Sequence, residues 1–218
     1  AGTFGKRSNL DVKWKRQFTQ KRPNKLNHFV GVKYHIKVAH PADLIALHNF
    51  EDGYCGISQV ENNKYCLCYL TTAHNLRRNR NDIHLAEKNI LMKNPFLNQI
   101  FSTAEFLYEE PVTISRISFN KKTQVENHVL LIGDAAGMIT PLCGNGMSMA
   151  MHGSKLAAEQ ISDFLKGRIN RFDMEQQYTQ QWEKHFGRRL IMGRILHRFF
   201  GNAALSNLLL IVVKPFPN

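Results

Sequence analysis

The sequence predicts an α+β fold, with an antiparallel or mixed β-sheet followed by helices. Three observations support this prediction. Short segments with alternating apolar residues, joined by tight turns, fill much of residues 28–71. A buried strand, a glycine-containing loop and a helix follow one another across residues 128–157. Finally, two long segments in the last third of the chain carry apolar residues at helical spacing.

The first half of the chain is predicted to form a sheet. The first ten residues have the composition of a turn, and residues 11–27 contain a short helix that ends before Pro23. The alternation in HFVGVKYHIKVAH predicts a half-buried strand over residues 28–40. Three further strands, at 44–50, 53–60 and 64–71, are separated by the turn sequences EDG and ENN. Such spacing is typical of an antiparallel meander.

The second half is predicted to be mainly helical. Asp82 is placed as the N-cap of a helix, and Pro95 begins a second one over 95–106. A strand at 111–119 and a polar connection lead into the apolar run VLLIGD, which is typical of a fully buried strand. Three helices are then expected, at 147–165, 172–200 and 203–213, the last of them buried or interfacial. The apolar stripe of the long helix recurs every fourth residue: Tyr178, Trp182, Phe186 and Leu190.

The composition is that of a globular protein with a basic charge balance. Of the 218 residues, 43% are hydrophobic and 21% charged, and the net charge is +12. Near the start, one acid, Asp11, faces ten cations: Lys6, Arg7, Lys13, Lys15, Arg16, Lys21, Arg22, Lys25, Lys33 and Lys37. A solvated face, an anionic membrane surface, or an anionic cofactor or substrate would each explain this excess. Nucleic acid is not expected, because aromatic residues are not interleaved with these bases and no nucleic-acid motif is present.

The cysteines predict neither a disulfide scaffold nor a metal site. Four cysteines are few for a chain of this length. Cys66 and Cys68 share one face of a predicted strand, where buried packing is the expected role, because no second ligand pair follows at zinc spacing. No charged-then-apolar leader is recognisable. We therefore expect a cytoplasmic protein, with peripheral contact to an anionic membrane as an option.

The loop after VLLIGD carries the chemistry. Gly133 allows a tight turn, and Asp134 offers a carboxylate that suits the hydroxyl groups of a sugar or polyol. Pro141 stiffens the loop, while Gly144 and Gly146 leave the backbone bare for a planar ring. The helix that begins after Gly146 directs its free N–H groups and positive dipole end toward the same place. A reduced flavin, negative at one edge of its ring, fits this description.

This loop does not match the G-x-G-x-x-G dinucleotide fingerprint, because Met149 replaces the third glycine. Instead, GDAAGMITPLCGNGMSMAMHGSKLAAE resembles the second FAD-binding motif of the aromatic-hydroxylase-type flavoproteins. Within them it is most similar to the geranylgeranyl-reductase-like branch. The resemblance implies that Gly133 and Asp134 contact FAD, with Asp134 hydrogen-bonded to the ribityl chain. It places Pro141 beside the isoalloxazine ring, and it implies backbone N–H contacts to the pyrimidine edge from four residues: Gly144, Asn145, Gly146 and Met147.

Two other segments resemble the same family less closely. Residues 2–8 are similar to its G-A-D-G-x-x-S motif, but Phe4 replaces the aspartate and Thr3 the alanine. Because that Asp-Gly pair is tied to both FAD and NADPH binding in the hydroxylases, the use of NAD(P)H as electron donor is left open. EDGYCGISQVENNKYCLCYL resembles a hairpin of the family's substrate domain, with departures at Cys55 and Gln59.

The family's first motif, a strand followed by G-x-G-x-x-G, does not occur in these 218 residues. The resemblance therefore implies the C-terminal part of a longer flavoprotein, in four segments. Residues 1–10 would form a junction, 11–125 a substrate-type sheet domain, 126–167 the C-terminal part of a Rossmann-like FAD-binding domain, and 168–218 C-terminal helices. This chain alone is expected to bind FAD weakly or not at all and to be inactive.

The function implied by the resemblance is that of an FAD-dependent oxidoreductase. It would transfer hydride to a polyprenyl or other apolar double bond, or activate oxygen for hydroxylation, so both a reductase and a monooxygenase are open. The substrate would be an apolar small molecule, lipid-like or aromatic. No side chain is assigned as an acid–base catalyst. The alternative is a non-enzymatic basic module that docks on an anionic membrane or a protein partner through the cationic N-terminal segment and the apolar LSNLLLIVVKPF.

Overall fold

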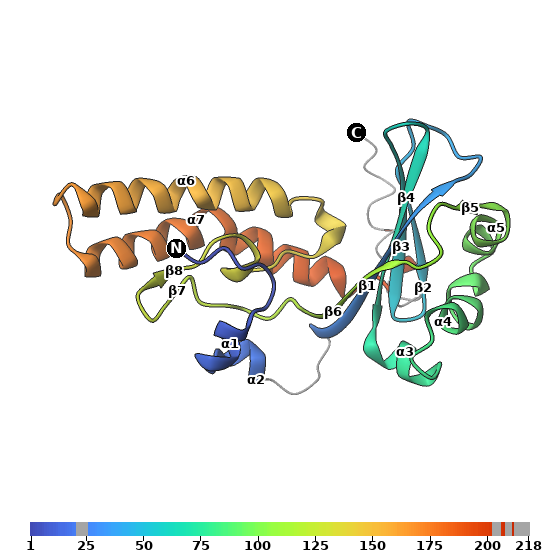
Figure 1. The fold of residues 1–218 in the computed structure, drawn as a ribbon, viewed down its shortest axis with the longest axis horizontal. Coiled ribbons are helices and arrows are strands. Elements are labelled where there is room, and N and C mark those ends of the chain that lie inside the picture. Colours follow the sequence, from blue (N-terminus) through green and yellow to red (C-terminus); the bar gives the residue numbers. More distant parts are fainter. Residues whose placement is uncertain (21–25, 202–205, 208–210, 212–218) are drawn as a thin grey trace. The chain divides into compact units, whose positions relative to one another are not determined.

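The computed structural model describes residues 1–20, 26–201, 206, 207 and 211. These residues confirm the predicted α+β class, with an antiparallel sheet and several helices (Figure 1). The chain divides into two compact units. The first contains residues 1–27 and 118–197, and the second contains residues 28–117 and 198–218. We describe the two units separately.

The second unit is built on a six-stranded sheet (Figure 1). Its strands are β1 (Asn27–Lys37), β2 (Ala46–Phe50), β3 (Gly53–Val60), β4 (Lys64–Thr72), β5 (Glu105–Phe106) and β6 (Val112–Ser118). The order is β2-β3-β4-β1-β5, and β6 also pairs with β1. Pairing is antiparallel between β2 and β3 and between β3 and β4, so the predicted meander is confirmed.

Short helices in the same unit follow local capping signals. They are α3 (Ala73–Arg78), α4 (Ile83–Asn89), the 3₁₀ turn η1 (Leu91–Lys93) and α5 (Pro95–Thr103). The predicted N-cap of α4 is confirmed, because the Asp82 carboxylate accepts a hydrogen bond of 3.0 Å from the Leu85 N–H. Helix α5 ends earlier than predicted, because Glu105 and Phe106 leave it to pair with β1. Helix α3 was not predicted.

The sheet buries one face against these helices. Alternate residues of β1, among them Val32, Tyr34 and Ile36, pack in one cluster with Leu91 and Leu97. On the opposite face, the expectation that Cys66 and Cys68 are buried was wrong. Cys66 is half-buried and Cys68 exposed, with their Sγ atoms 3.7 Å apart, since the pleat turns this face of β4 away from the core.

The first unit is mainly helical. Its elements are α1 (Asn9–Lys13), α2 (Gln17–Gln20), β7 (Val125–Glu126), β8 (Val129–Leu130), η2 (Gly133–Ala135), η3 (Pro141–Cys143), α6 (Gly146–Leu165) and α7 (Arg171–His197). Helices α6 and α7 run side by side (Figure 1). The predicted stripe of α7 is confirmed, because all four of its large side chains are buried in the core of this unit.

The apolar run before Gly133 is buried, but its pairing is shorter than a full strand. Residues 129 and 130 form a hairpin with β7, and Leu131 then makes a parallel bridge to Gly2. The left-handed backbone of Gly133, with φ of +62°, turns the chain into η2 and ends the strand. The first ten residues, predicted as a turn, therefore also contribute a parallel bridge, since Gly2 pairs with Leu131 just before the loop.

Most of the helix predicted at 203–213 lies outside the described residues. Within the described part of the chain, no helix is long and apolar enough to cross a membrane.

Candidate functional site

The Gly-Asp loop connects β8 to α6. The predicted site residues lie in this loop and in the first two residues of α6, Gly146 and Met147. Gly133, Asp134 and Gly146 line one small cavity of about 10 Å³. A volume of about 10–15 Å³ is the lower limit for a single water molecule, so a ring system does not fit inside. Any larger ligand must therefore lie on the outer surface of the loop.

That outer surface is bare backbone. Apart from its chain neighbours, no described residue would lie within 4 Å of a Cβ atom built on Gly144 or on Gly146. The backbone at position 144 has a left-handed φ of +61°, a conformation that favours glycine. Pro141 is exposed, and the Met147 side chain beside Gly146 is 82% exposed. A flat ring can therefore approach the loop at both glycines without displacing a side chain there.

Helix α6 begins at Gly146, in the middle of this bare surface. Asn145 is its N-cap residue, but the Asn145 side chain makes no cap hydrogen bond and instead accepts one of 2.6 Å from the Ser148 hydroxyl. The first N–H groups of an α-helix have no partner within the helix. They provide donors and a positive dipole end beside the two glycines, which suits a polar ring edge that carries negative charge.

Asp134 presents a free carboxylate in η2. Among the described residues, none donates a hydrogen bond to its side-chain oxygens. Burial raises the pKa of the Asp134 carboxyl, and the charge of the Lys122 ammonium partly offsets this rise. A ligand hydroxyl that donates to Asp134 would therefore supply a hydrogen bond that the protein does not make itself.

The Lys122 side chain holds the loop by a hydrogen bond to a backbone carbonyl of the loop. Its Nζ donates to the Asp134 carbonyl at 2.6 Å and to the Lys6 carbonyl at 2.7 Å, and it lies 4.4 Å from the centre of the Phe18 ring. Burial lowers the pKa of Lys122 to about 8. No motif in the sequence marks this residue, because the carbonyls that it holds are not recognisable from residue type.

Arg16 supports the next residue of the loop. It donates to the Ala135 carbonyl at 3.1 Å and pairs with the Asp11 carboxylate at 2.6 Å, with both charged side chains only 1% exposed. Among the cations near the start of the chain, Arg16 is thus an internal structural residue. The single acid Asp11 among ten cations was the signal in the sequence for such a pair.

Helix α7 packs closely against the same loop at two glycines. A Cβ on Gly137 would lie 2.6 Å from the Trp182 ring, and one on Gly193 would lie 3.3 Å from both Cys143 Sγ and Thr140 Oγ1. The Thr140 hydroxyl also donates to the Gly193 carbonyl at 3.4 Å. The loop is therefore held on one side by buried cations and on another by α7.

Comparison with known proteins finds one matching family model and partial similarity to several longer proteins. The family model described as lycopene cyclase protein matches residues 107–211. An uncharacterized protein of Methanocaldococcus jannaschii is 33% identical over 96 residues, which are 43% of this chain and 24% of that protein. A digeranylgeranylglycerophospholipid reductase of Methanococcus vannielii is 36% identical over 67 residues, which are 30% of this chain and 17% of the reductase. The chain thus spans a quarter or less of these two relatives.

Solved structures share the fold at low sequence identity. The flavin-dependent halogenase CmlS aligns with a TM-score of 0.68 at 17% identity, over 85% of this chain and 34% of the halogenase. A variant of HpxO from Klebsiella pneumoniae, complexed with FAD, aligns with a TM-score of 0.67 at 15% identity, over 98% of this chain and 56% of that one.

Proposed function

We propose that the chain belongs to the FAD-dependent oxidoreductase superfamily and that its Gly-Asp loop holds the ribityl chain and the isoalloxazine ring of FAD. One observation carries this proposal. An unpartnered Asp134 carboxylate lies on the same loop as the two bare glycines at the start of α6. Segment 126–167 would accordingly be the part of an FAD-binding domain that contacts the flavin ring.

Each residue has a defined role in this proposal. The Asp134 carboxylate accepts hydrogen bonds from ribityl hydroxyls. The N–H groups of Asn145, Gly146 and Met147 would face the pyrimidine edge, and Pro141 would lie beside the ring. The Gly144 N–H already donates to the Pro141 carbonyl at 2.9 Å, so Gly144 would contribute bare backbone to the site. The positive end of α6 favours negative charge at that edge, which raises the reduction potential of the flavin. Lys122 and Arg16 keep the loop in position from the backbone side.

Bound FAD would supply either hydride transfer or oxygen activation. We propose an apolar substrate, lipid-like or aromatic, for the whole protein, with segment 11–125 as the substrate-type domain. The similarity to a reductase named for a digeranylgeranylglycerophospholipid supports this substrate class. The alternative of a basic docking module has less support, because Arg16, one of the ten cations on which it depends, is buried and paired with Asp11.

Flavin titration followed by amide NMR tests the proposal. Riboflavin and FAD are added to the isotope-labelled chain, and the largest shifts are expected at the amides of Gly144, Gly146 and Met147. Binding of the chain alone is expected to be weak. Gly146→Ala is the sharpest variant, because its new Cβ meets no described residue within 4 Å but occupies the space proposed for the ring. It should lower riboflavin affinity about tenfold without unfolding the chain.

Asp134→Ala should likewise weaken binding about tenfold, through loss of charge-assisted hydrogen bonds. Two matched variants serve as controls. Asp163→Ala removes a half-buried carboxylate near the far end of α6 that pairs with Arg168, and Gly187→Ala adds a Cβ that also meets no described residue within 4 Å. Both should bind riboflavin as the wild type does. Shifts confined to other residues, or unchanged affinity in both Gly146→Ala and Asp134→Ala, would refute the proposal.

A further inference from the structure

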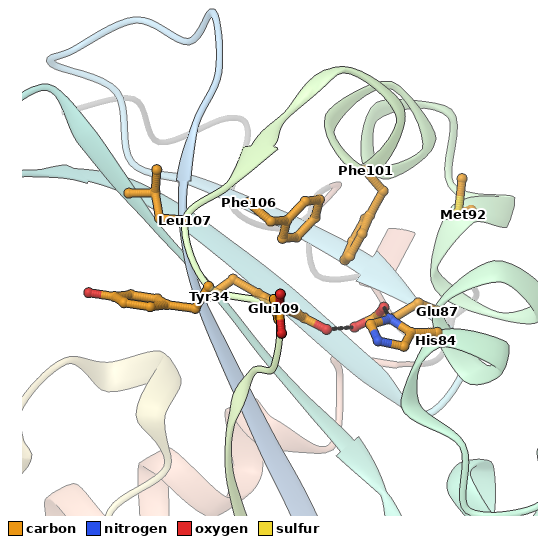
Figure 2. Close-up of a pocket in the computed structure, with 9 residues that line it drawn as sticks. Tyr34, His84, Glu87, Met92, Phe101, Phe106, Leu107 and Glu109 are labelled. Carbon is orange, nitrogen blue, oxygen red and sulfur yellow. Dashed lines mark hydrogen bonds and ion pairs between the residues drawn. The ribbon is translucent and has the colours of Figure 1, made fainter.

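The sheet unit contains a second cavity, of about 520 Å³, that plays no part in the flavin proposal (Figure 2). Its walls are mostly apolar, formed by Met92, Phe101, Phe106 and Leu107. Its volume lies within the range of about 300–1,000 Å³ that is usual for small-molecule sites. The cavity also contains a buried carboxylate, and this feature distinguishes it from a gap in the packing.

The carboxylate is that of Glu87 on α4, a residue only 4% exposed. One oxygen, Oε1, accepts hydrogen bonds of 2.8 Å from both the Tyr34 and the Tyr69 hydroxyls. The other, Oε2, lies 3.2 Å from Nδ1 of the largely exposed His84 (Figure 2). Two strands and a helix therefore fix this acidic group in one orientation at the wall of the cavity.

The charge of the cavity is opposite to that of the chain. Although the net charge is +12, the described residues that line the cavity include two carboxylates, Glu87 and Glu109, one histidine, His84, and no lysine or arginine. A negative site of this kind attracts cations and disfavours phosphates and carboxylates. This electrostatic preference is local, since it is not a property of the composition.

The aromatic walls suit the same class of ligand. The Tyr34 ring packs edge-on against Phe106 at 4.9 Å between centroids, and Phe101 lies 6.0 Å from Phe106 at an angle of 31°. Figure 2 shows Phe101 and Phe106 next to each other above the Tyr34–Glu87 hydrogen bond. Aromatic faces attract an ammonium group, and they also cover the apolar body that carries it.

We propose that this cavity binds a small organic cation, with its ammonium group at Glu87 and its flat apolar body against Phe101 and Phe106. The size of the cavity, its negative charge and its aromatic walls select this class together. The inference is independent of the flavin site, since it concerns other residues in the other unit.

Phenethylamine is a suitable probe, with phenethyl alcohol and hydrocinnamate as neutral and anionic molecules of similar shape. Calorimetric titration of the full chain should show binding of the amine, and affinities about tenfold or more weaker for the other two. Glu87→Gln should weaken amine binding by about tenfold, because it removes the charge and keeps an acceptor for both tyrosines. Glu61→Gln, at an exposed carboxylate in a turn of the same unit, should change nothing.

Leu107→Trp provides a second test, which holds even if the Glu87→Gln protein does not fold. Its larger side chain narrows the cavity, so amine binding should be weakened. Three results would each overturn the proposal: no amine binding up to about 10 mM, equal affinity for the amine and hydrocinnamate, or amine affinity unchanged in Leu107→Trp. Amine affinity unchanged in a folded Glu87→Gln protein would remove the role of the carboxylate and overturn it as well.

Discussion

Two glycines of α7 allow the packing of this helix against the Gly-Asp loop to be measured. Gly187 and Gly193 lie in the same helix, six residues apart, but differ in what surrounds them. A Cβ on Gly187 would meet no atom of the described chain within 4 Å. A Cβ on Gly193 would lie 3.3 Å from Cys143 Sγ and Thr140 Oγ1, which belong to the loop. Gly187→Ala and Gly193→Ala therefore form a matched pair.

The expected free energies follow from these contacts. Replacing glycine by alanine inside a helix stabilises it by about 1 kcal/mol, and both variants gain this term. Overpacking of the Gly193 site costs about 1–3 kcal/mol, because Cys143 and Thr140 must move by a few tenths of an ångström. Gly187→Ala should thus raise the free energy of unfolding by about 1 kcal/mol. Gly193→Ala should leave it unchanged or lower it by up to about 2 kcal/mol.

Urea unfolding followed by tryptophan fluorescence measures this difference. Both tryptophans, Trp14 and Trp182, belong to the first unit, so the emission reports on the unit that contains α7. The urea midpoint of Gly187→Ala should lie above that of the wild type, and the urea midpoint of Gly193→Ala should lie at or below it. If Gly193→Ala stabilises the protein as much as Gly187→Ala, the loop is not packed against α7 as described.

Two further predictions concern buried titratable groups. Burial lowers the pKa of His197 to about 4, so the unfolded chain takes up a proton first as the pH falls. The free energy of unfolding of the first unit should fall by up to about 3 kcal/mol between roughly pH 6.5 and pH 4. If the free energy of unfolding of His197→Gln falls by the same amount over this range, His197 is not the cause. Glu87→Ala should cost about 3 kcal/mol, because the Tyr34 and Tyr69 hydroxyls lose their acceptor. Burial raises the pKa of Glu87, which penalises its ionised form in the folded state. Glu87→Gln should therefore gain stability relative to wild type as the pH rises above about 4.5, as thermal melts at several pH values can show.

Local signals in the sequence predicted much of the fold. Alternation along residues 28–40 marked the central strand, and Asp82 marked the start of α4, because each signal depends on neighbouring residues alone. The four-residue spacing of the large side chains in α7 predicted its buried face for the same reason. Helix α3 escaped prediction because its sequence, AHNLRR, is short and polar and carries little apolar periodicity.

The support of the loop was not predictable in the same way. Arg16 reaches the Ala135 carbonyl across 119 positions of sequence, and Lys122 reaches the Lys6 carbonyl across 116. Backbone carbonyls carry no residue identity, so no sequence pattern announces such bonds. Glu87 did leave a signal, because it lies at the helical spacing of Ile83, Ile90 and Leu91, among core positions where a carboxylate is unusual.

The bridge between Gly2 and Leu131 has a consequence for the order in which the two units form during synthesis. Gly2 leaves the ribosome more than a hundred residues before Leu130, whose carbonyl accepts a hydrogen bond of 2.7 Å from the Gly2 N–H. Residues 28–117 lie between them, and this contiguous segment can begin to fold in the meantime. The Gly-Asp loop is therefore completed late, because Gly2 can pair with Leu131 only after residues 28–117 have been synthesised.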